Sequence, residues 1–190
     1  GLKGEVYDGG IRVPGIIYWK GKVKEGQSNE TPAGLIDILP TLADVCGFKV
    51  PTDRKIDGTS LSPLFDGKDF NRNTPLMWFF YRAYPEIAMR TDDYILIGNA
   101  LDSIPRTHRI SDRDMDFIKN IELKEFELDN IIYEPAQQNN LAESHPDILN
   151  KMKPQMISLL EEIKQESPYW KGLSKYESMP SKFKKEYIPK

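Results

Sequence analysis

Apolar residues recur at helical spacing in two stretches of the chain. The first, residues 37–47, predicts a short helix with Asp37 as its N-terminal cap and Gly47 as its C-terminal stop. The second, residues 144–165, is the longest such pattern and predicts a helix with one apolar face. Pro154 lies inside this pattern. An interior proline removes a hydrogen bond at a cost of about 3 kcal/mol, so we expect a kink there or two separate helices.

Between these stretches, short runs of β-branched and aromatic residues bounded by turn residues are typical of strands. Four such runs predict an antiparallel meander: residues 76–81, 87–90, 94–97 and 123–128. The C-terminal helix is expected to cover one face of these strands, because that buries both apolar surfaces with few elements. An earlier apolar run, residues 11–19, predicts a buried strand. Ser60 and Gly67 bound a predicted helix of one or two turns.

The opening residues, 1–14, are difficult to explain by packing alone. Gly4, Gly9 and Gly10 allow backbone conformations closed to other residues, and charged side chains lie among them. The pattern predicts a tight loop that holds Lys3, Asp8 and Arg12 close together before the apolar run. A loop that leads into a buried strand is a common place for a functional site.

Composition describes an ordinary globular protein. The chain has 190 residues, of which 39% are hydrophobic and 29% charged, and a chain of this length buries roughly 70% of its unfolded surface. Its 26 basic and 29 acidic residues give a net charge of −3, which provides no overall field to attract nucleic acid or an anionic membrane. No apolar run is long enough to span a bilayer. The chain begins without an initiating Met or a signal peptide, so we expect a fragment whose true N-terminus lies elsewhere.

The sequence offers no recognisable metal site. A single cysteine, Cys46, excludes an internal disulfide and a cysteine-built zinc site, and we expect it to be a small buried residue. His108 and His145 lie far apart and have no neighbouring ligand at helical spacing. The acidic run at residues 112–116 lacks the glycine and the distal glutamate of a calcium loop.

Cationic and hydrogen-bonding side chains also gather away from the opening residues. Tyr81 and Arg82 form one such group, and Arg106 and His108 lie in a long polar insertion, residues 102–120. Long loops without regular structure are often functional. The alternative is a solvated loop with ordinary surface charges.

The opening block also resembles a known family. Lys3-Gly4 followed by Tyr7-Asp8-Gly9-Gly10-Ile11-Arg12-Val13-Pro14 is similar to the signature K-G-x-x-Y-E-G-G-x-R-V-P of the type I, formylglycine-dependent sulfatases, which belong to the alkaline phosphatase superfamily. The resemblance implies that Lys3 contacts the sulfate group in the active site. It also implies that Tyr7, Asp8 and Arg12 do not contact the sulfate group themselves. They are expected to hold the loop that presents Lys3, with an ion pair between Asp8 and Arg12. Asp8 stands where the signature has Glu.

Further blocks resemble scaffold motifs of the same family. Residues 57–67 are similar to D-G-x-S-L-x-P-L-x-x-G, which in these sulfatases lies at the join between a large and a small domain. Residues 127–142 are similar to E-L-Y-D-L-x-x-D-P-x-E-x-x-N-L-A, with departures at Asp129, Asn130, Ile131 and Glu134. The resemblance implies the C-terminal part of an α/β, alkaline-phosphatase-like sulfatase fold with a small α+β subdomain. We expect residues 1–70 to end the large catalytic domain, 71–168 to form the antiparallel sheet and helix, and 169–190 to form an extended tail.

The family's reactive groups are absent from this sequence. Its nucleophile is a cysteine in C-x-P-x-R that is converted to formylglycine, whereas Cys46 is followed by Gly-Phe-Lys-Val. The Ca²⁺ ligands of the family precede the lysine block, so the resemblance places Ca²⁺ and formylglycine upstream and assigns neither to residues of this chain. We therefore expect this chain to have the missing N-terminal portion of the same protein as a partner. This chain alone is expected to be inactive.

The resemblance implies that the complete enzyme hydrolyses sulfate esters, with a sulfated carbohydrate or another sulfated small molecule as its partner. The cationic and hydrogen-bonding groups of Tyr81, Arg82, Arg106 and His108 would suit a sulfated sugar. Family members are periplasmic, secreted or lysosomal. Two alternatives remain open: a phosphodiesterase or phosphonate hydrolase of the same superfamily, and a non-catalytic glycan-binding module.

Overall fold

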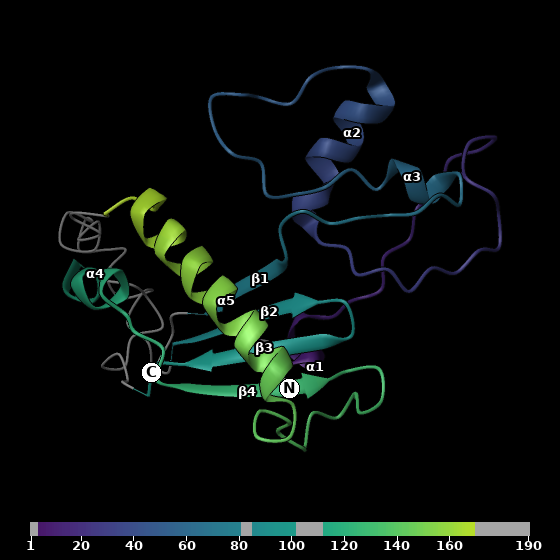
Figure 1. Cartoon of the computed structure of the whole chain (residues 1–190). Coiled ribbons are helices and arrows are strands. Elements are labelled where there is room, and N and C mark those ends of the chain that lie inside the picture. Colours follow the sequence, from purple (N-terminus) through teal and green to yellow (C-terminus); the bar gives the residue numbers. More distant parts are fainter. Residues whose placement is uncertain (1–3, 81–84, 102–111, 170–190) are drawn as a thin grey trace, which may run out of the picture.

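The computed structural model describes residues 4–80, 85–101 and 112–169. Its elements follow one another along the chain in this order (Figure 1): α1 (Asp8–Ile11), the 3₁₀ turn η1 (Leu35–Asp37), α2 (Ile38–Cys46), α3 (Ser62–Phe65), β1 (Leu76–Phe80), β2 (Glu86–Thr91), β3 (Tyr94–Asn99), α4 (Asp112–Lys119), β4 (Glu125–Asn130) and α5 (Pro146–Glu166). No helix among these residues is long and apolar enough to cross a membrane.

The strands form one antiparallel sheet in the order β1-β2-β3-β4, so the predicted meander is confirmed. Thr91 pairs with Tyr94 across a two-residue turn, in which Asp92 takes a left-handed φ of 49°. Aspartate tolerates this conformation better than most residues, and tight hairpin turns require it. The sequence pattern therefore located both the strands and their order.

Helix α5 covers one face of the sheet, in front of the strands in Figure 1. Side chains alternate along a strand, so every second residue of the sheet points at the helix. Gly98 in β3 has no side chain, and a Cβ atom there would lie 2.9 Å from the sulfur of Met156. This absence lets α5 pack closely. The buried core between helix and sheet comprises Ile87, Met89, Leu96, Ala100, Ile121, Leu128, Met152, Met156 and Leu160.

Helix α5 runs through Pro154 without ending, so the expectation of two helices was wrong. Pro154 is exposed, as are its neighbours Asn150 and Ile157. The carbonyl group that loses its hydrogen bond to the proline therefore lies on the side of the helix that water reaches, and water can replace the lost partner.

The opposite face of the sheet is covered by the N-terminal residues, including α1. Val6 is fully buried there, against Ala88, Ile95 and Ile97 of the two central strands. Tyr7, Ile11 and Trp78 are partly buried around the same cluster. The sheet is thus apolar on both faces, with helix α5 on one side and the N-terminal block on the other.

The predicted buried strand at residues 11–19 is wrong. The structure has no strand there, and Ile16 is 92% and Val13 80% exposed. A strand must pair its backbone N–H and C=O groups with a neighbour. Among the described residues, the four strands of the sheet pair only with one another, which leaves this run without a partner.

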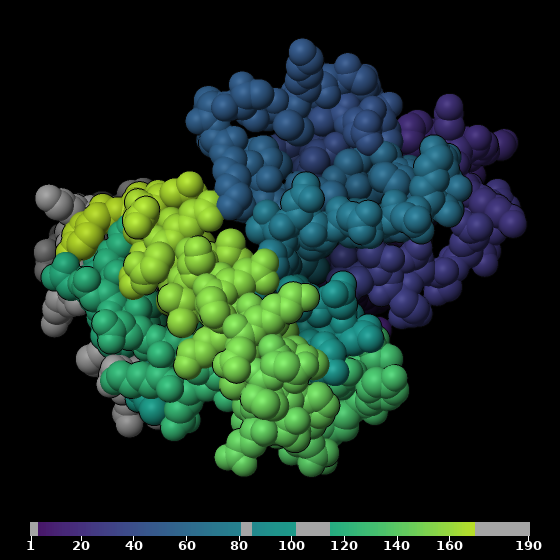
Figure 2. All heavy atoms as spheres, in the orientation of Figure 1, coloured from purple at the N-terminus to yellow at the C-terminus, as the bar shows by residue number. Residues whose placement is uncertain are grey.

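Helix α2 forms where predicted, with Gly47 at its end in a left-handed conformation, but its apolar face is not buried. Ile38 and Leu42 are about half exposed, whereas Thr41 and Ala43 are buried. Cys46 is exposed, which contradicts the expectation of a buried residue. In Figure 2 the residues around α2 form a lobe above the sheet and α5, so much of this helix lies away from the main core.

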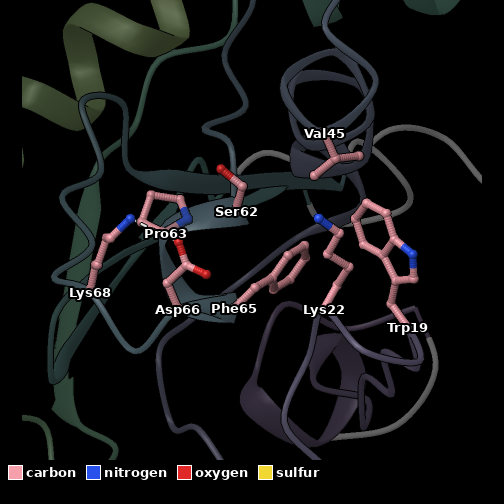
Figure 3. Close-up of a pocket in the computed structure, with 8 residues that line it drawn as sticks. All are labelled: Trp19, Lys22, Val45, Ser62, Pro63, Phe65, Asp66 and Lys68. Carbon is pink, nitrogen blue, oxygen red and sulfur yellow. Dashed lines mark hydrogen bonds and ion pairs between the residues drawn. The ribbon is translucent and has the colours of Figure 1, made fainter.

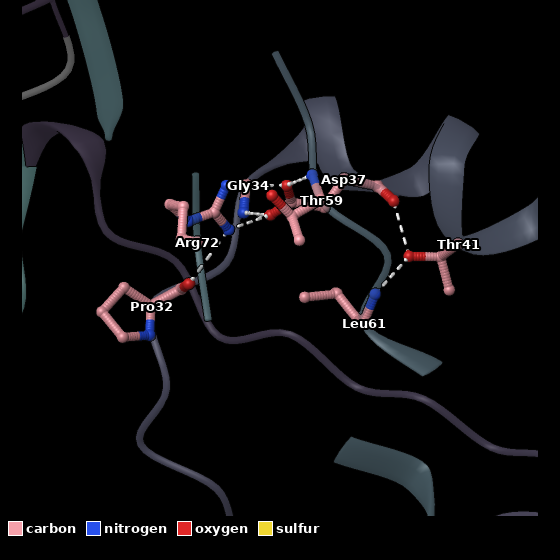
Figure 4. Close-up of polar contacts among 7 residues, drawn as sticks. All are labelled: Pro32, Gly34, Asp37, Thr41, Thr59, Leu61 and Arg72. Carbon is pink, nitrogen blue, oxygen red and sulfur yellow. Dashed lines mark hydrogen bonds and ion pairs between the residues drawn. The ribbon is translucent and has the colours of Figure 1, made fainter. Parts of the chain in front are cut away.

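One buried carboxylate holds that lobe together (Figure 4). Asp37 is fully buried and does not cap α2 as predicted. Its carboxylate instead accepts hydrogen bonds from the backbone N–H of Gly34 at 2.7 Å and of Thr59 at 2.9 Å. Arg72 adds two more, at 2.9 and 2.6 Å, and also donates to the carbonyl of Pro32. The group joins three segments that are distant in sequence.

The hydrogen bonds decide the ionisation of Asp37. Burial by itself raises the pKa of this carboxyl, but the bonds from Arg72, Thr59 and Gly34 outweigh burial and lower the pKa below its ordinary value. Because the folded-state pKa is lowered, this contribution to stability is present above the pKa of the unfolded chain. It is lost as the pH falls through the lowered folded-state pKa.

Asp37→Ala is expected to lower the free energy of unfolding by about 3–5 kcal/mol, because it leaves the largely buried Arg72 without its counter-ion. Urea unfolding followed by circular dichroism measures the loss. The matched control is Asp53→Ala, which removes an exposed ion pair to Arg54 and should leave the free energy of unfolding nearly unchanged. Equal losses in the two variants would contradict this account.

Candidate functional site

The N-terminal block, residues 4–12, is the part of the predicted site that the structure describes. The expected glycine loop is one helical turn, closed by hydrogen bonds from Gly10 N–H to the Tyr7 carbonyl and from Arg12 N–H to the Asp8 carbonyl. Of its three glycines, only Gly4 has a positive φ, of 97°. That conformation favours glycine, so the chain bends next to Lys3 and becomes helical four residues later.

Tyr7 connects the block to β4, an edge strand of the sheet. Its ring packs at the margin of the apolar cluster that Val6 forms with Ala88, Ile95 and Ile97. Its hydroxyl donates a hydrogen bond to Glu127 Oε2 in β4 at 3.0 Å. Burial, and then the neighbouring carboxylate of Glu127, raise the pKa of Tyr7 well above its ordinary value. Tyr7 therefore remains a protonated donor across the physiological range.

Asp8 and Arg12 form the predicted ion pair, with 3.4 Å between an Arg12 terminal nitrogen and Asp8 Oδ2. The Arg12 side chain is about half exposed and also approaches Glu30 at 3.9 Å. An ion pair with that much solvent contact contributes little to stability. The backbone of Asp8 is held more firmly, because its N–H donates to Gln137 Oε1 at 2.6 Å in a buried position.

Gln137 and Asp129 are the residues that sequence reasoning missed. Gln137 lies in the turn after β4, where its Nε2 group donates to Asp129 Oδ2 at 3.3 Å. Asp129 is 1% exposed. Within the described part of the chain, its Oδ1 atom has no hydrogen-bond partner. The available signal was a carboxylate at an inward position of a strand, directly opposite Ile95.

Asp129 is an unusual acid. Burial raises its pKa to about 6, the carboxylates of Glu127 and Glu134 add to the rise, and the hydrogen bond from Gln137 opposes it. Glu86 on β2 behaves similarly, since burial and then Glu5 and Glu127 raise its pKa. The sheet surface next to the block is therefore acidic. Across residues 4–80, 85–101 and 112–169, no group of three or more His, Cys, Asp or Glu side chains could hold a metal ion.

The remaining predicted site residues lie outside the described residues: Lys3, Tyr81, Arg82, Arg106 and His108. Among the described candidates, Tyr7, Asp8 and Arg12 lie together in the N-terminal block.

An open hollow lies elsewhere, between the coil near Trp19 and helices α2 and α3 (Figure 3). Its volume is about 290 Å³, and Lys22, Phe65 and Lys68 contribute to its walls. The ammonium group of Lys68 is paired with Asp66 at 2.8 Å. Of the described candidates, Tyr7, Asp8 and Arg12 do not line this hollow.

Comparison with known proteins identifies the family of this chain. A family model described as N-sulphoglucosamine sulphohydrolase, C-terminal, matches residues 3–165. The chain belongs to this family. The resemblance drawn from the opening block is thereby confirmed, and the chain is the C-terminal region of a sulfatase.

Several named sulfatases are similar to this region. Steryl-sulfatase of Rattus norvegicus is 39% identical over 84 residues, which cover 44% of this chain and 15% of that protein. Arylsulfatase A of Homo sapiens is 38% identical over 97 residues, or 48% of this chain and 18% of that protein. The uncharacterized sulfatase YdeN of Escherichia coli strain K12 is 26% identical over 168 residues, or 80% and 30%. This sulfatase region thus spans less than a third of each relative.

Solved structures support the fold. The crystal structure of Ps i-CgsB matches with a TM-score of 0.58 at 18% identity and covers 90% of this chain and 34% of that one. The structure of yidJ from Bacteroides fragilis matches with a TM-score of 0.54 at 20% identity, over 80% and 29%. The predicted small α+β part of a sulfatase, an antiparallel sheet with a C-terminal helix packed on it, is confirmed.

The sulfatase region should show an unusual dependence of stability on pH because of Asp129. Its pKa is about 6 when folded and 3.8 ordinarily, so the folded state binds the proton more tightly between these values. Stability from this group is complete below the ordinary pKa and is lost as the pH rises through about 6. The loss amounts to about 3 kcal/mol at most.

Asp129→Asn removes this titration while keeping an oxygen that accepts from Gln137. The unmodified chain should therefore lose stability between pH 4 and pH 8 relative to the variant. The free energy of unfolding of Asp129→Asn, compared with that of the unmodified chain, should be higher at pH 8 than at pH 4. Urea unfolding at both pH values measures this, with the exposed Asp69 changed to Asn as the control. If Asp129→Asn and Asp69→Asn show the same pH dependence, the buried charge is not the cause.

Proposed function

We propose that the complete protein hydrolyses sulfate esters. The observation that carries the proposal is the match of the sulfatase family model from Lys3 to residue 165. Formylglycine and Ca²⁺ are proposed to lie in a part of the protein outside this sequence, since Cys46 lacks the C-x-P-x-R context. The described residues do not fit a metal site, so no step through either group is assigned to this chain.

The proposed role of Lys3 is to bind the sulfate group. Hydrolysis of a sulfate ester moves negative charge toward the leaving oxygen and the sulfuryl oxygens. A fixed ammonium group in a partly dehydrated site stabilises that charge without reorganising when the reaction occurs. The attachment of Tyr7 and Asp8 to the sheet supports this role, because it anchors the chain a few residues after Lys3.

The proposed substrate is a sulfated carbohydrate. The name of the matching family, N-sulphoglucosamine sulphohydrolase, supports an amino sugar. Tyr81, Arg82, Arg106 and His108 are retained as candidates for contacts with its hydroxyl and sulfate groups. The relatives include steryl-sulfatase, so substrate class differs among similar proteins and a direct comparison of substrates is needed.

The exposed apolar residues fit the proposed domain organisation. We propose that residues 1–70 complete a large catalytic domain and that residues 71–168 form the small one, followed by the tail 169–190. Ile16, Leu35 and Leu39 then contact the rest of the large domain and are buried in the complete protein. Their present exposure, between 43% and 92%, and the greater length of the sulfatase relatives support this arrangement.

In the complete protein, Lys3→Ala is expected to lower kcat/KM for a sulfate ester by about 10²–10³, because it removes charge stabilisation from the transition state. The folded state, checked by circular dichroism, should be unchanged. Lys24→Ala, at an exposed lysine, is the matched control. A near-normal rate for Lys3→Ala removes Lys3 from the site. Faster hydrolysis of a phosphate diester or a phosphonate ester favours the related hydrolase instead.

The 190-residue chain alone is expected to show no turnover of an aryl sulfate, because it lacks the proposed nucleophile and metal ligands. Turnover by the purified chain contradicts this placement of the chemistry.

Calorimetry of the same chain with a sulfated oligosaccharide tests the remaining alternative, a non-catalytic glycan-binding module. Binding without catalysis in the complete protein favours a glycan-binding module.

A further inference from the structure

Apolar packing and hydrogen bonds from Tyr7 and Asp8 join the block 4–12 to the sheet and to the turn after β4. Val6 packs into the apolar cluster with Ala88, Ile95 and Ile97. This contact attaches the block to the sheet but does not fix its orientation. The Tyr7 hydroxyl reaches Glu127 through a long side chain. The bond from Asp8 N–H to Gln137 Oε1 holds the backbone of the block directly, and it is short and buried.

Gln137 is itself firmly oriented. The residue is 8% exposed, and its backbone has a left-handed φ of 51° in the turn that follows β4. Its N–H donates to the Glu134 carbonyl at 3.2 Å. On the far side of the amide, Nε2 donates to Asp129 Oδ2. Both ends of the amide are therefore used, one toward the block and one toward the sheet.

The chemistry of the two partners requires an amide between them. The Asp8 N–H can only donate, and an ionised Asp129 carboxylate can only accept. Glutamine offers one acceptor and one donor group on a planar unit, so it satisfies both partners at once. A glutamate would place a second carboxylate against Asp129, and an apolar residue would leave the buried Asp8 N–H unpaired.

We propose that Gln137 is a positioning residue, which together with Asp129 sets the location of the block and hence of Lys3. The inference rests on the proposed role of Lys3 in binding sulfate. Catalytic rates are sensitive to displacements of about 1 Å, which can change a rate by about 10²-fold. Loss of the Gln137 contact displaces the block and reduces turnover although Gln137 does not touch the substrate.

The test uses three variants of the complete protein. Gln137→Met keeps an unbranched chain of similar length and removes both hydrogen bonds. Gln137→Glu keeps the acceptor and loses the donor. The double variant Gln137→Glu with Asp129→Asn exchanges donor and acceptor, so the introduced amide donates to the introduced carboxylate and both contacts return. Gln138→Met, at the exposed neighbouring glutamine, is the matched control.

Two readouts are compared at pH 8. Hydrogen–deuterium exchange of the peptide containing residues 4–12 reports how firmly the block is held against the sheet. Steady-state kinetics report turnover. For Gln137→Met and Gln137→Glu we expect exchange of this peptide to rise about tenfold and kcat to fall about 10–100-fold. The double variant should recover most of both, and Gln138→Met should change neither.

The rescue separates positioning from general destabilisation, since a merely structural loss is not restored by exchanging two polar groups. Unchanged exchange and turnover in Gln137→Met, while Lys3→Ala is inactive, overturns the inference and leaves the proposed function standing. A folded double variant without recovery also overturns it. If Lys3→Ala retains activity but Gln137→Met still frees the block, the role of Lys3 fails and the contact from Gln137 to the block stands.

Discussion

Burial of apolar side chains on both faces of one β-sheet determines where the other elements of this region lie. A four-stranded sheet with a single covered face leaves its other face to water, and polar residues then alternate with apolar ones. Here Ala88, Ile95 and Ile97 make the second face apolar as well. Helix α5 covers one side, and the N-terminal block supplies Val6 to the other. The proposed sulfate-binding end of the chain is therefore attached to the sheet by the same force that forms the core.

Apolar contact supplies attachment but not direction, and polar groups at low exposure add the direction. Hydrogen bonds to buried charged groups are worth more than those at the surface, and they are costly to leave unmade. The region uses this twice. Asp37 joins three segments of the α2 lobe through four donors, and Asp129 orients Gln137 against Asp8. The first carboxylate accepts four hydrogen bonds and ionises easily. The second has one oxygen without a hydrogen-bond partner among the described residues, and it ionises with difficulty.

The sequence predicted those parts of the fold that depend on local periodicity. Short runs of β-branched and aromatic residues within 76–97, and alternation in 123–128, located the strands, and helical spacing located α2 and α5. It failed where an element depends on what lies beside it. Residues 11–19 have the composition of a buried strand but no partner, and the apolar face of α2 is exposed. In the site, Lys3 and its neighbours were identified by motif, whereas Gln137 was not, because a contact between residues 129 positions apart leaves no local pattern.

That separation has a consequence for how the site forms. Tyr7 and Asp8 both bind residues more than one hundred positions later, in β4 and the turn after it. The block therefore has no fixed place until the meander is complete and the turn containing Gln137 has closed. Interactions that form late in folding also tend to be the first lost, so the site is expected to loosen before the sheet and α5 do. In this region the proposed binding of sulfate depends on the last contacts of the fold as much as on Lys3 itself.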